Sequence, residues 1–244
     1  MGKIDFNLGK KGAHPKCWAS VLGQCKGPLD KEHLFSEALY SEKSIHVDGA
    51  PWLNGPKMKI GRSAFTSNIL CKGHNNKLSK VDKEAVRFRK ALSITRDPMK
   101  RPNSKILQPP PEIKISGTKF GQWLCKTHCN IITVTGGIPE LSYVQYAFGE
   151  RTEKKVFFYF IAMVGEQLQV GREHYTYIAP PKDDKIYDFI TIFSGIKVLV
   201  TTTQINAFDW KFIDRLNDFQ LQTALGLYKI HFDWSNEPQP LGSV

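Results

Sequence analysis

The clearest hydrophobic pattern in the chain lies over residues 77–92. Apolar residues recur there three or four positions apart, and several lysines and arginines stand between them. A stripe of this kind is typical of an amphipathic helix with one face against a core. The apolar positions are Leu78, Val81, Ala85, Phe88 and Leu92. We therefore predict a helix over 77–92 whose outer face is basic.

The second half of the chain contains short apolar runs rich in β-branched and aromatic residues, separated by turn residues, a pattern that favours strands. Two helices are also predicted in this half, over 117–130 and 208–216. The predicted strands are 156–163, 167–170, 174–178, 186–193 and 197–203. The expected fold class is α+β, with a second half of strongly β character.

Proline interrupts the chain between residues 97 and 111, where five prolines stand among several lysines and arginines. Proline neither continues a helix nor donates to a strand ladder, so this composition favours an extended linker. We predict a first domain over residues 1–100, a linker over 101–111 and a second domain over 112–244. A chain of 244 residues is long enough for both.

The formal charge divides at the same place. The whole chain carries +11, but residues 1–110 contain 21 Lys/Arg and 9 Asp/Glu, a net charge of +12, and the remainder carries −1. A basic half indicates a polyanion as partner, and the neutral half indicates a different task.

Hydropathy and cysteine content narrow the class of protein. No apolar run reaches the roughly 20 residues of a membrane-spanning helix, and the first residues lack the apolar region of a secretory signal. We therefore expect a cytoplasmic protein with no membrane partner. Its five cysteines are an odd number, which in a reducing compartment favours metal ligands or free thiols over disulfides.

Four residues in the basic half have the chemistry of zinc ligands. Cys71 and His74 have two residues between them, the spacing with which one tight turn presents two ligands to a tetrahedral ion. Cys17 and Cys25 have seven residues between them, in a turn-rich segment. Taken singly, each of the four is explained as well by a buried thiol or a core histidine. Together, around one short basic region, they favour a structural zinc site.

A second run of similar composition, Cys125-Lys-Thr-His-Cys-Asn130, lies in the predicted helix 117–130. No further pair of ligands stands near it in the sequence. Free cysteine is among the most often buried residue types, so we predict buried structural thiols here.

Glu32 and His33 stand between the two pairs of zinc ligands, and Asn75 follows the last ligand directly. This order of a cysteine pair, an acidic residue with histidine, a second ligand pair with asparagine, and a helix resembles the HNH, or ββα-metal, endonuclease superfamily. It is most similar to the zinc-stapled branch of the phage endonuclease VII type, over about residues 14–92. The resemblance implies a small zinc-stapled ββα domain that cleaves DNA, in proteins that serve anti-phage defence, toxin systems or recombination.

The resemblance also implies a role for each residue of the motif. His33 would be the general base that takes a proton from the attacking water, which suits an imidazole with a pKa of about 6.5. Glu32 and Asn75 would hold one catalytic Mg²⁺ or Mn²⁺ through oxygen atoms, the ligands that such cations prefer. Asn76 and Asp82 are further candidates for this metal site, although Asp82 is explained equally well as a surface carboxylate.

Basic residues near the motif are expected to contact the DNA backbone, although a run of charge also occurs on ordinary solvated faces. They are Lys57, Lys59, Arg62, Lys72, Lys77 and Lys80. Double-stranded DNA is the expected partner, and the second half would serve sensing, substrate binding or oligomerisation. Two alternatives stay open: a zinc-containing nucleic-acid-binding module without catalysis, and a nuclease regulated by a ligand or partner of its second half.

Overall fold

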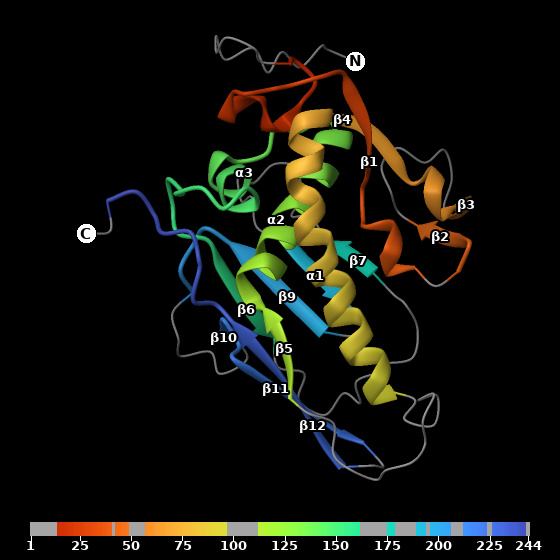
Figure 1. Cartoon of the computed structure of the whole chain (residues 1–244), viewed down its shortest axis with the longest axis vertical. Coiled ribbons are helices and arrows are strands. Elements are labelled where there is room, and N and C mark those ends of the chain that lie inside the picture. The colour runs from red at the N-terminus through yellow and green to blue at the C-terminus, as the bar shows by residue number, and fades with distance from the viewer. Residues whose placement is uncertain are drawn as a thin grey trace.

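The computed structural model describes residues 14–40, 42–48, 57–96, 112–161, 175–178, 189–193, 196–205, 212–223 and 226–242. Helices and several small sheets are mixed along these residues, so the predicted α+β class is confirmed. Figure 1 shows the long helix α1 (Lys72–Arg96) in front of α2 (Gly117–Val134), with most strands of the second half in the lower part of the view.

The N-terminal part is built on two antiparallel strands followed directly by the long helix. β1 (Leu29–His33) pairs with β4 (Thr66–Cys71), and α1 begins at the next residue. The register of this pair shifts between Asp30 and Glu32. The shorter elements around the pair are η1 (Trp18–Leu22), η2 (Glu37–Leu39), β2 (Ser44–Asp48), β3 (Lys57–Gly61) and η3 (Arg62–Ala64), with β2 antiparallel to β3.

α1 begins before and ends after the helix predicted over 77–92. All five apolar positions of the predicted stripe are buried, which confirms its orientation toward the core. The early start has a local reason. The backbone N–H of Lys72 donates to the carbonyl of Pro28 and that of Gly73 to the carbonyl of Lys26, both at 2.9 Å. These bonds satisfy two of the N–H groups that a helix leaves unpaired in its first turn.

In its described residues, the C-terminal part combines two helices with two sheets. Besides α2 it contains β5 (Ile113–Ser116), α3 (Leu141–Ala147), β6 (Phe157–Ile161), β7 (Tyr175–Ile178), β8 (Phe189–Phe193), β9 (Ile196–Thr201), β10 (Phe212–Asp214), β11 (Asp218–Thr223) and β12 (Gly226–Asp233). One sheet has the order β10-β6-β9-β8-β7, and the other has the order β11-β12-β5 with β12 parallel to β5. The predicted helix 117–130 is confirmed as α2, and β6 to β9 confirm four predicted strands. The predicted strand 167–170 lies outside the described residues.

The helix predicted over 208–216 is wrong in its described part. Phe212–Asp214 forms the edge strand β10, antiparallel to β6, while residues 206–211 lie outside the described ranges. The backbone N–H of the following residue, Arg215, donates to the backbone carbonyl of Phe158, and the guanidinium of Arg215 donates to the backbone carbonyl of Val156. Pairing with β6 thus makes Phe212–Asp214 a strand, although the apolar residues of 208–216 predicted a helix.

Buried side chains from both sides of the proline-rich segment form one contiguous hydrophobic core. α2 lies within it and packs against α1, α3, β4 and η1. The predicted linker over 101–111 is outside the described residues, and the division into two domains stays a prediction. None of the helices in the described ranges combines the length and the apolar character that a membrane crossing requires.

Gly117, the first residue of α2, lies against the indole ring of Trp234. A Cβ atom at this position would meet ring atoms of Trp234 at 2.5 Å. We expect Gly117→Ala to lower the free energy of unfolding by about 1–3 kcal/mol, because a close-packed interior accommodates an added methyl group only by moving its neighbours. Denaturant unfolding followed by tryptophan fluorescence measures this change.

The matched control is Gly61→Ala, since a Cβ there would meet nothing within 4 Å. Its free energy of unfolding should change by less than about 0.5 kcal/mol. Equal stability of the two variants would contradict the tight packing of α2 on Trp234.

Candidate metal centre and nuclease site

The cysteine and histidine cluster is assembled from two places in the chain. Cys17 precedes η1 and Cys25 follows it, and Gly23 between them has a φ of 75°, a left-handed conformation that suits glycine and turns the chain after η1. Cys71 is the last residue of β4, and His74 stands in the first turn of α1. The two-residue spacing predicted to form a tight turn therefore spans a junction between strand and helix.

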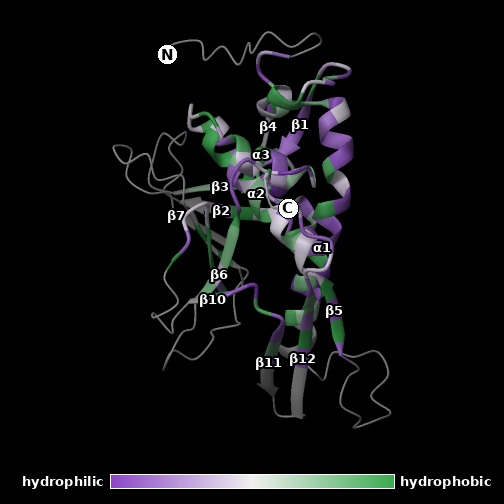
Figure 2. Cartoon of the chain, turned by 90° about the vertical axis from the view of Figure 1, so that its left-hand side faces the viewer, coloured by the Kyte–Doolittle hydropathy of each residue, from purple (hydrophilic) through white to green (hydrophobic). Residues whose placement is uncertain are grey.

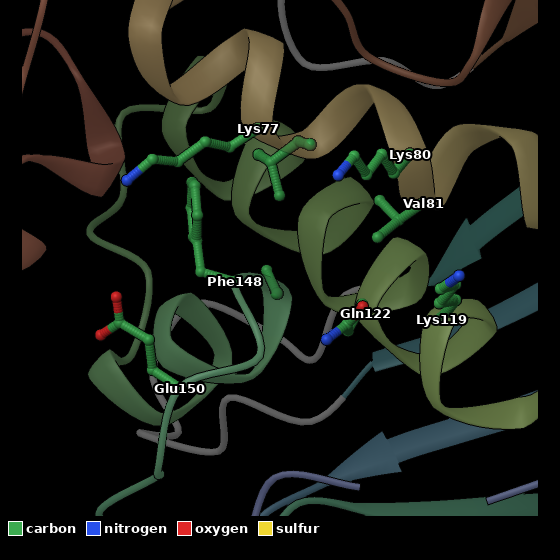
Figure 3. Close-up of a pocket in the computed structure, with 9 residues that line it drawn as sticks. Lys77, Lys80, Val81, Lys119, Gln122, Phe148 and Glu150 are labelled. Atoms are coloured by element: carbon green, nitrogen blue, oxygen red, sulfur yellow. The ribbon is translucent and has the colours of Figure 1, made fainter. Parts of the chain in front are cut away.

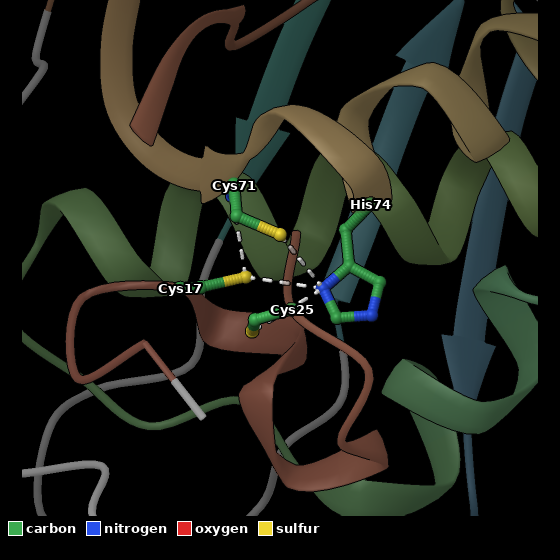
Figure 4. A group of neighbouring side chains, drawn as sticks. All are labelled: Cys17, Cys25, Cys71 and His74. Atoms are coloured by element: carbon green, nitrogen blue, oxygen red, sulfur yellow. Dashed lines mark hydrogen bonds between the residues drawn. The ribbon is translucent and has the colours of Figure 1, made fainter. Parts of the chain in front are cut away.

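The four side chains point toward one another (Figure 4). The Sγ atoms of Cys17 and Cys71 lie 3.3 Å from Nδ1 of His74, and Sγ of Cys25 lies 3.7 Å from it. All four ligand atoms fall within 4.8 Å of one another. Around a tetrahedral zinc ion, neighbouring sulfur and nitrogen ligands lie about 3.6–3.8 Å apart. The cluster therefore has the chemistry and the dimensions to bind a metal ion such as zinc.

Burial and hydrogen bonding set the protonation of these groups. Burial raises the pKa of the Cys17 and Cys25 thiols. For Cys71, burial also acts to raise the pKa, but hydrogen bonds, first those to the backbone of His74 and Lys26, outweigh it and the net pKa is lowered. Burial lowers the pKa of His74, and the charge of Lys77 lowers it further. A neutral imidazole is the form that binds a metal, and cysteines bind it as thiolates, with their protons released to solvent.

The second half of the chain packs directly against this cluster. Phe148, which follows α3, meets the ring of His74 edge to face, with centroids 5.2 Å apart, and that of Trp18 at 5.9 Å. The indole N–H of Trp18 donates to Oδ1 of Asn130 on α2 at 2.9 Å. The cluster thus joins the N-terminal segment to α1, and residues of α2 and residues just after α3 pack against it or against its neighbour Trp18.

Glu32, a predicted ligand of the catalytic metal, is buried under α2. Its side chain is 4% exposed, and its Oε1 lies 2.7 Å from Nζ of Lys126. Nδ2 of Asn130 donates to the same Oε1 at 3.3 Å and to the backbone carbonyl of His33 at 3.1 Å. Burial raises the pKa of Glu32, and the charge of Lys126 opposes that effect. The structure therefore pairs Glu32 with a lysine from the second half of the chain.

Asp82 belongs to the same polar network. Nζ of Lys126 lies 2.8 Å from Oδ1 and 2.7 Å from Oδ2 of Asp82. The hydroxyl of Ser36 donates to Oδ1 of Asp82 and accepts a hydrogen bond of 2.9 Å from the indole N–H of Trp123. Glu32 and Asp82, which are far apart in sequence, are thus joined through one ammonium group.

His33 ends β1, and its imidazole is half-buried. Nε2 lies 3.4 Å from Oε2 of Glu37, and the other carboxylate oxygen of Glu37 lies 3.3 Å from Nε of Arg62. Burial lowers the pKa of His33, Glu37 acts in the opposite direction, and the charge of Lys126 lowers it further. His33 is therefore a neutral imidazole beside a carboxylate, which is a form able to accept a proton.

Asn75 contacts a different carboxylate from the one predicted. Its Nδ2 lies 3.3 Å from Oδ2 of Asp30, which precedes Glu32 by two residues on β1. Asn76 is exposed in the first turns of α1. The structure thus places Asn75 with Asp30 near the start of β1, and Glu32 with Asp82 and Lys126 nearer its end.

The basic residues predicted to contact DNA surround these groups. Lys59, Lys72, Lys77 and Lys80 are exposed, and for Lys57 only the backbone, in β3, is described. Arg62 is half-buried, and besides its contact with Glu37 its Nη1 donates to the carbonyl of Tyr40 at 2.9 Å. Figure 2 shows the upper turns of α1, next to β1 and β4, as largely hydrophilic.

A pocket of about 290 Å³ lies between α1 and the pair of helices α2 and α3 (Figure 3). The charged residues that line it are Lys77, Lys80, Lys119 and Glu150. Phe148 forms part of the wall and also packs on His74, so the pocket lies beside the metal cluster. Two of the predicted DNA contacts, Lys77 and Lys80, therefore face one concave surface with a third lysine.

Comparisons of the chain with protein-family models, with curated proteins and with solved structures give no significant match. What the site can do is therefore argued from its own side chains. These are a cluster of four groups that could bind a metal, an imidazole beside a carboxylate, and the carboxylates of Asp30, Glu32 and Asp82.

Sequence reasoning missed four residues of this site, namely Asp30, Glu37, Lys126 and Asn130. Lys126 had a readable signal, because a lysine among the apolar residues of helix 117–130 must find a partner of opposite charge if that helix is buried. Asp30 and Glu37 had none, since nothing in their spacing distinguishes them from surface carboxylates.

Proposed function

We propose that this protein is a metal-dependent HNH-type endonuclease that hydrolyses phosphodiester bonds of double-stranded DNA. One observation carries the proposal, the order of elements at the metal cluster. β1 and β4 are antiparallel and α1 follows at once, with Cys71 and His74 at the junction and His33 at the end of β1. Two strands and a helix joined by a zinc ion are what the sequence resemblance implies.

The zinc ion in this proposal is structural. Cys17, Cys25, Cys71 and His74 supply four ligands, which fills a tetrahedral shell and leaves no position for substrate. Its effect is to fix the start of α1 against the segment that leads into β1. Catalysis in this proposal therefore falls to other residues of β1 and α1.

His33 is the proposed general base. Its neutral imidazole takes a proton from a water molecule as that water attacks phosphorus, and Glu37 stabilises the imidazolium that forms. The side chain of His33 is 29% exposed, and its Nε2 is buried beside Glu37, which leaves Nδ1 as the nitrogen that would accept the proton. Exposed lysines of β3 and α1 would hold the phosphates on either side by charge.

Carboxylate and amide oxygens of Glu32, Asp30 and Asn75 fit the donor chemistry of Mg²⁺ or Mn²⁺. The contacts of Lys126 and Asn130 both use Oε1 of Glu32, and we propose Oε2 as the atom for the metal. When bound, such an ion supplies positive charge for the phosphoryl oxygens and the leaving oxygen.

Incubation of the full chain with supercoiled plasmid and Mg²⁺ or Mn²⁺ tests the proposal. The expected result is conversion to nicked and then linear DNA that depends on the added metal. His33→Ala protein, purified in parallel, controls for contaminating nucleases. Plasmid that is bound but stays supercoiled with either metal would contradict an endonuclease.

One observation favours a second candidate, a zinc-containing nucleic-acid-binding module without catalysis. The carboxylate of Glu32 is already neutralised by Lys126 at 2.7 Å, an arrangement that also occurs where a carboxylate serves only packing. In that case plasmid affinity would not change on addition of Mg²⁺ and no nicking would follow.

A further inference from the structure

A lysine from the second half of the chain is buried beneath the proposed catalytic motif. The side chain of Lys126 is 3% exposed, and its Nζ lies 2.7 Å from Oε1 of Glu32 and 2.8 and 2.7 Å from the two oxygens of Asp82. Lysine is almost never fully buried unless it is paired. Here both of its partners belong to the segment that carries the nuclease motif.

Lys126 is one member of a row on α2. Trp123, Lys126 and Asn130 recur three and four residues apart, which places them on one face of the helix. Each contacts the same stretch of the N-terminal half: Trp123 bonds the hydroxyl of Ser36, and Asn130 bonds both Glu32 and the backbone carbonyl of His33. This face of α2 therefore meets the end of β1 and the residues just after it with hydrogen-bonding groups.

We propose that Lys126 is a positioning residue of the nuclease site, one that holds the Glu32 carboxylate in place for the catalytic metal. The inference rests on the proposed nuclease function and deepens it, because it makes the second half of the chain part of the catalytic site. Lys126 and Asn130 bind one carboxylate oxygen, Oε1, and so set the direction of the other. The ammonium charge also offsets the repulsion between Glu32 and Asp82, which would otherwise drive the two carboxylates apart.

Two other roles for Lys126 give different results when it is replaced. A lysine that only stabilises the fold would alter the unfolding transition and leave the metal requirement of the folded protein unchanged. A lysine that competes with the metal would, on removal, lower the concentration of metal needed. A positioning lysine has the opposite effect, since its removal weakens the binding of metal to Glu32.

The test compares Lys126→Met and Lys126→Arg in the full chain. Lys154→Met is the matched control, because Lys154 forms an exposed ion pair of 3.1 Å with Glu140 in the same half. Three quantities are measured for each variant. The rate of single-turnover plasmid nicking is measured as a function of Mn²⁺ concentration, and the affinity for Mn²⁺ without DNA is measured by calorimetry. The affinity for plasmid is measured without added divalent metal. Zinc content and a cooperative unfolding transition show which variants are folded.

We expect Lys126→Met to reduce the nicking rate and the affinity for Mn²⁺ by about 10- to 100-fold, the usual effect of losing a group that orients a metal ligand. Plasmid affinity and zinc content should match those of Lys154→Met. Lys126→Arg should recover part of both losses, because guanidinium also binds two carboxylates.

A second pair of variants serves if Lys126→Met does not fold. Asp82→Asn removes the negative charge of one of the two partners of Lys126, so the double variant Asp82→Asn/Lys126→Met no longer buries two unpaired carboxylates. Compared with Asp82→Asn alone, the double variant should still show a lower nicking rate and a lower affinity for Mn²⁺. Two outcomes in a folded variant without Lys126 would overturn this inference and leave the proposed function standing. One is a nicking rate and an affinity for Mn²⁺ that do not change, and the other is a lower Mn²⁺ concentration required for nicking. Absence of nicking by the unaltered protein would overturn the proposed function and this inference with it.

Discussion

Replacing Cys71 with serine is expected to eliminate zinc binding and to unfold the N-terminal part of the chain. Cys71 supplies one of four ligand atoms and also joins β4 to α1, so its loss opens the metal cluster at the point where strand and helix meet. Zinc binding in small modules amounts to about 10–16 kcal/mol, comparable to the whole stability of a domain, about 5–15 kcal/mol. The zinc content measured by elemental analysis should fall from about one zinc per chain to almost none. The unfolding temperature measured by circular dichroism should also be lower.

Cys125→Ala is the matched control for this prediction. Cys125 is a free, fully buried cysteine on α2 that does not belong to the cluster of four, so this variant should keep its zinc. A chelator should lower the unfolding temperature of the unaltered protein and of Cys125→Ala alike. Retention of one zinc per chain by Cys71→Ser would refute the assignment of these ligands.

Replacing His33 with alanine is expected to remove nicking activity and to leave the fold intact. A positioned general base contributes about 10²- to 10⁴-fold to a rate, and loss of the imidazole should reduce the single-turnover nicking rate by that factor. The side chain is 29% exposed, so its removal leaves a hollow that opens to solvent and no closed cavity in the core. Plasmid nicking in Mn²⁺, zinc content and the unfolding temperature are the three measurements.

The pH profile of the unaltered protein adds a second expectation for His33. The base must be neutral, so the rate falls as the pH decreases through the pKa of this imidazole. Burial lowers that pKa, and the fall should therefore occur below the ordinary histidine value of about 6.5. His33→Ala should show no such fall in its residual rate, and nicking by His33→Ala at the unaltered rate would exclude His33 as the base.

Several features could be predicted from the sequence because their causes are local. The apolar stripe from Leu78 to Leu92 predicted the buried face of α1, and all of its positions are in the core. The ligand spacing of Cys71 and His74 predicted that their side chains could share an ion, and the structure brings both to Cys17 and Cys25. The run at 125–130 was predicted to hold buried thiols, and Cys125 and Cys129 are fully buried.

Other features depended on contacts between distant segments. The apolar spacing over 208–216 is compatible with a helix, yet Phe212–Asp214 pairs with β6 as an edge strand. Glu32 looked like a free ligand beside His33, since no residue near it in sequence indicates a buried partner. Its partner, Lys126, lies in the other half of the chain.

The sequence by itself determined the α+β class, the two long helices and the four side chains that could bind a metal, because these depend on residue types and on spacing within short segments. The tertiary structure decided which carboxylate meets which cation. Asn75 lies beside Asp30, and Glu32 and Asp82 share the ammonium of Lys126. The physical reason is that burying Lys126 requires compensating charge, and the residues that provide it meet only when α2 packs against β1 and α1. Thus the basic N-terminal half supplies the motif of the proposed nuclease, and the neutral half supplies the cation that pairs with its carboxylates.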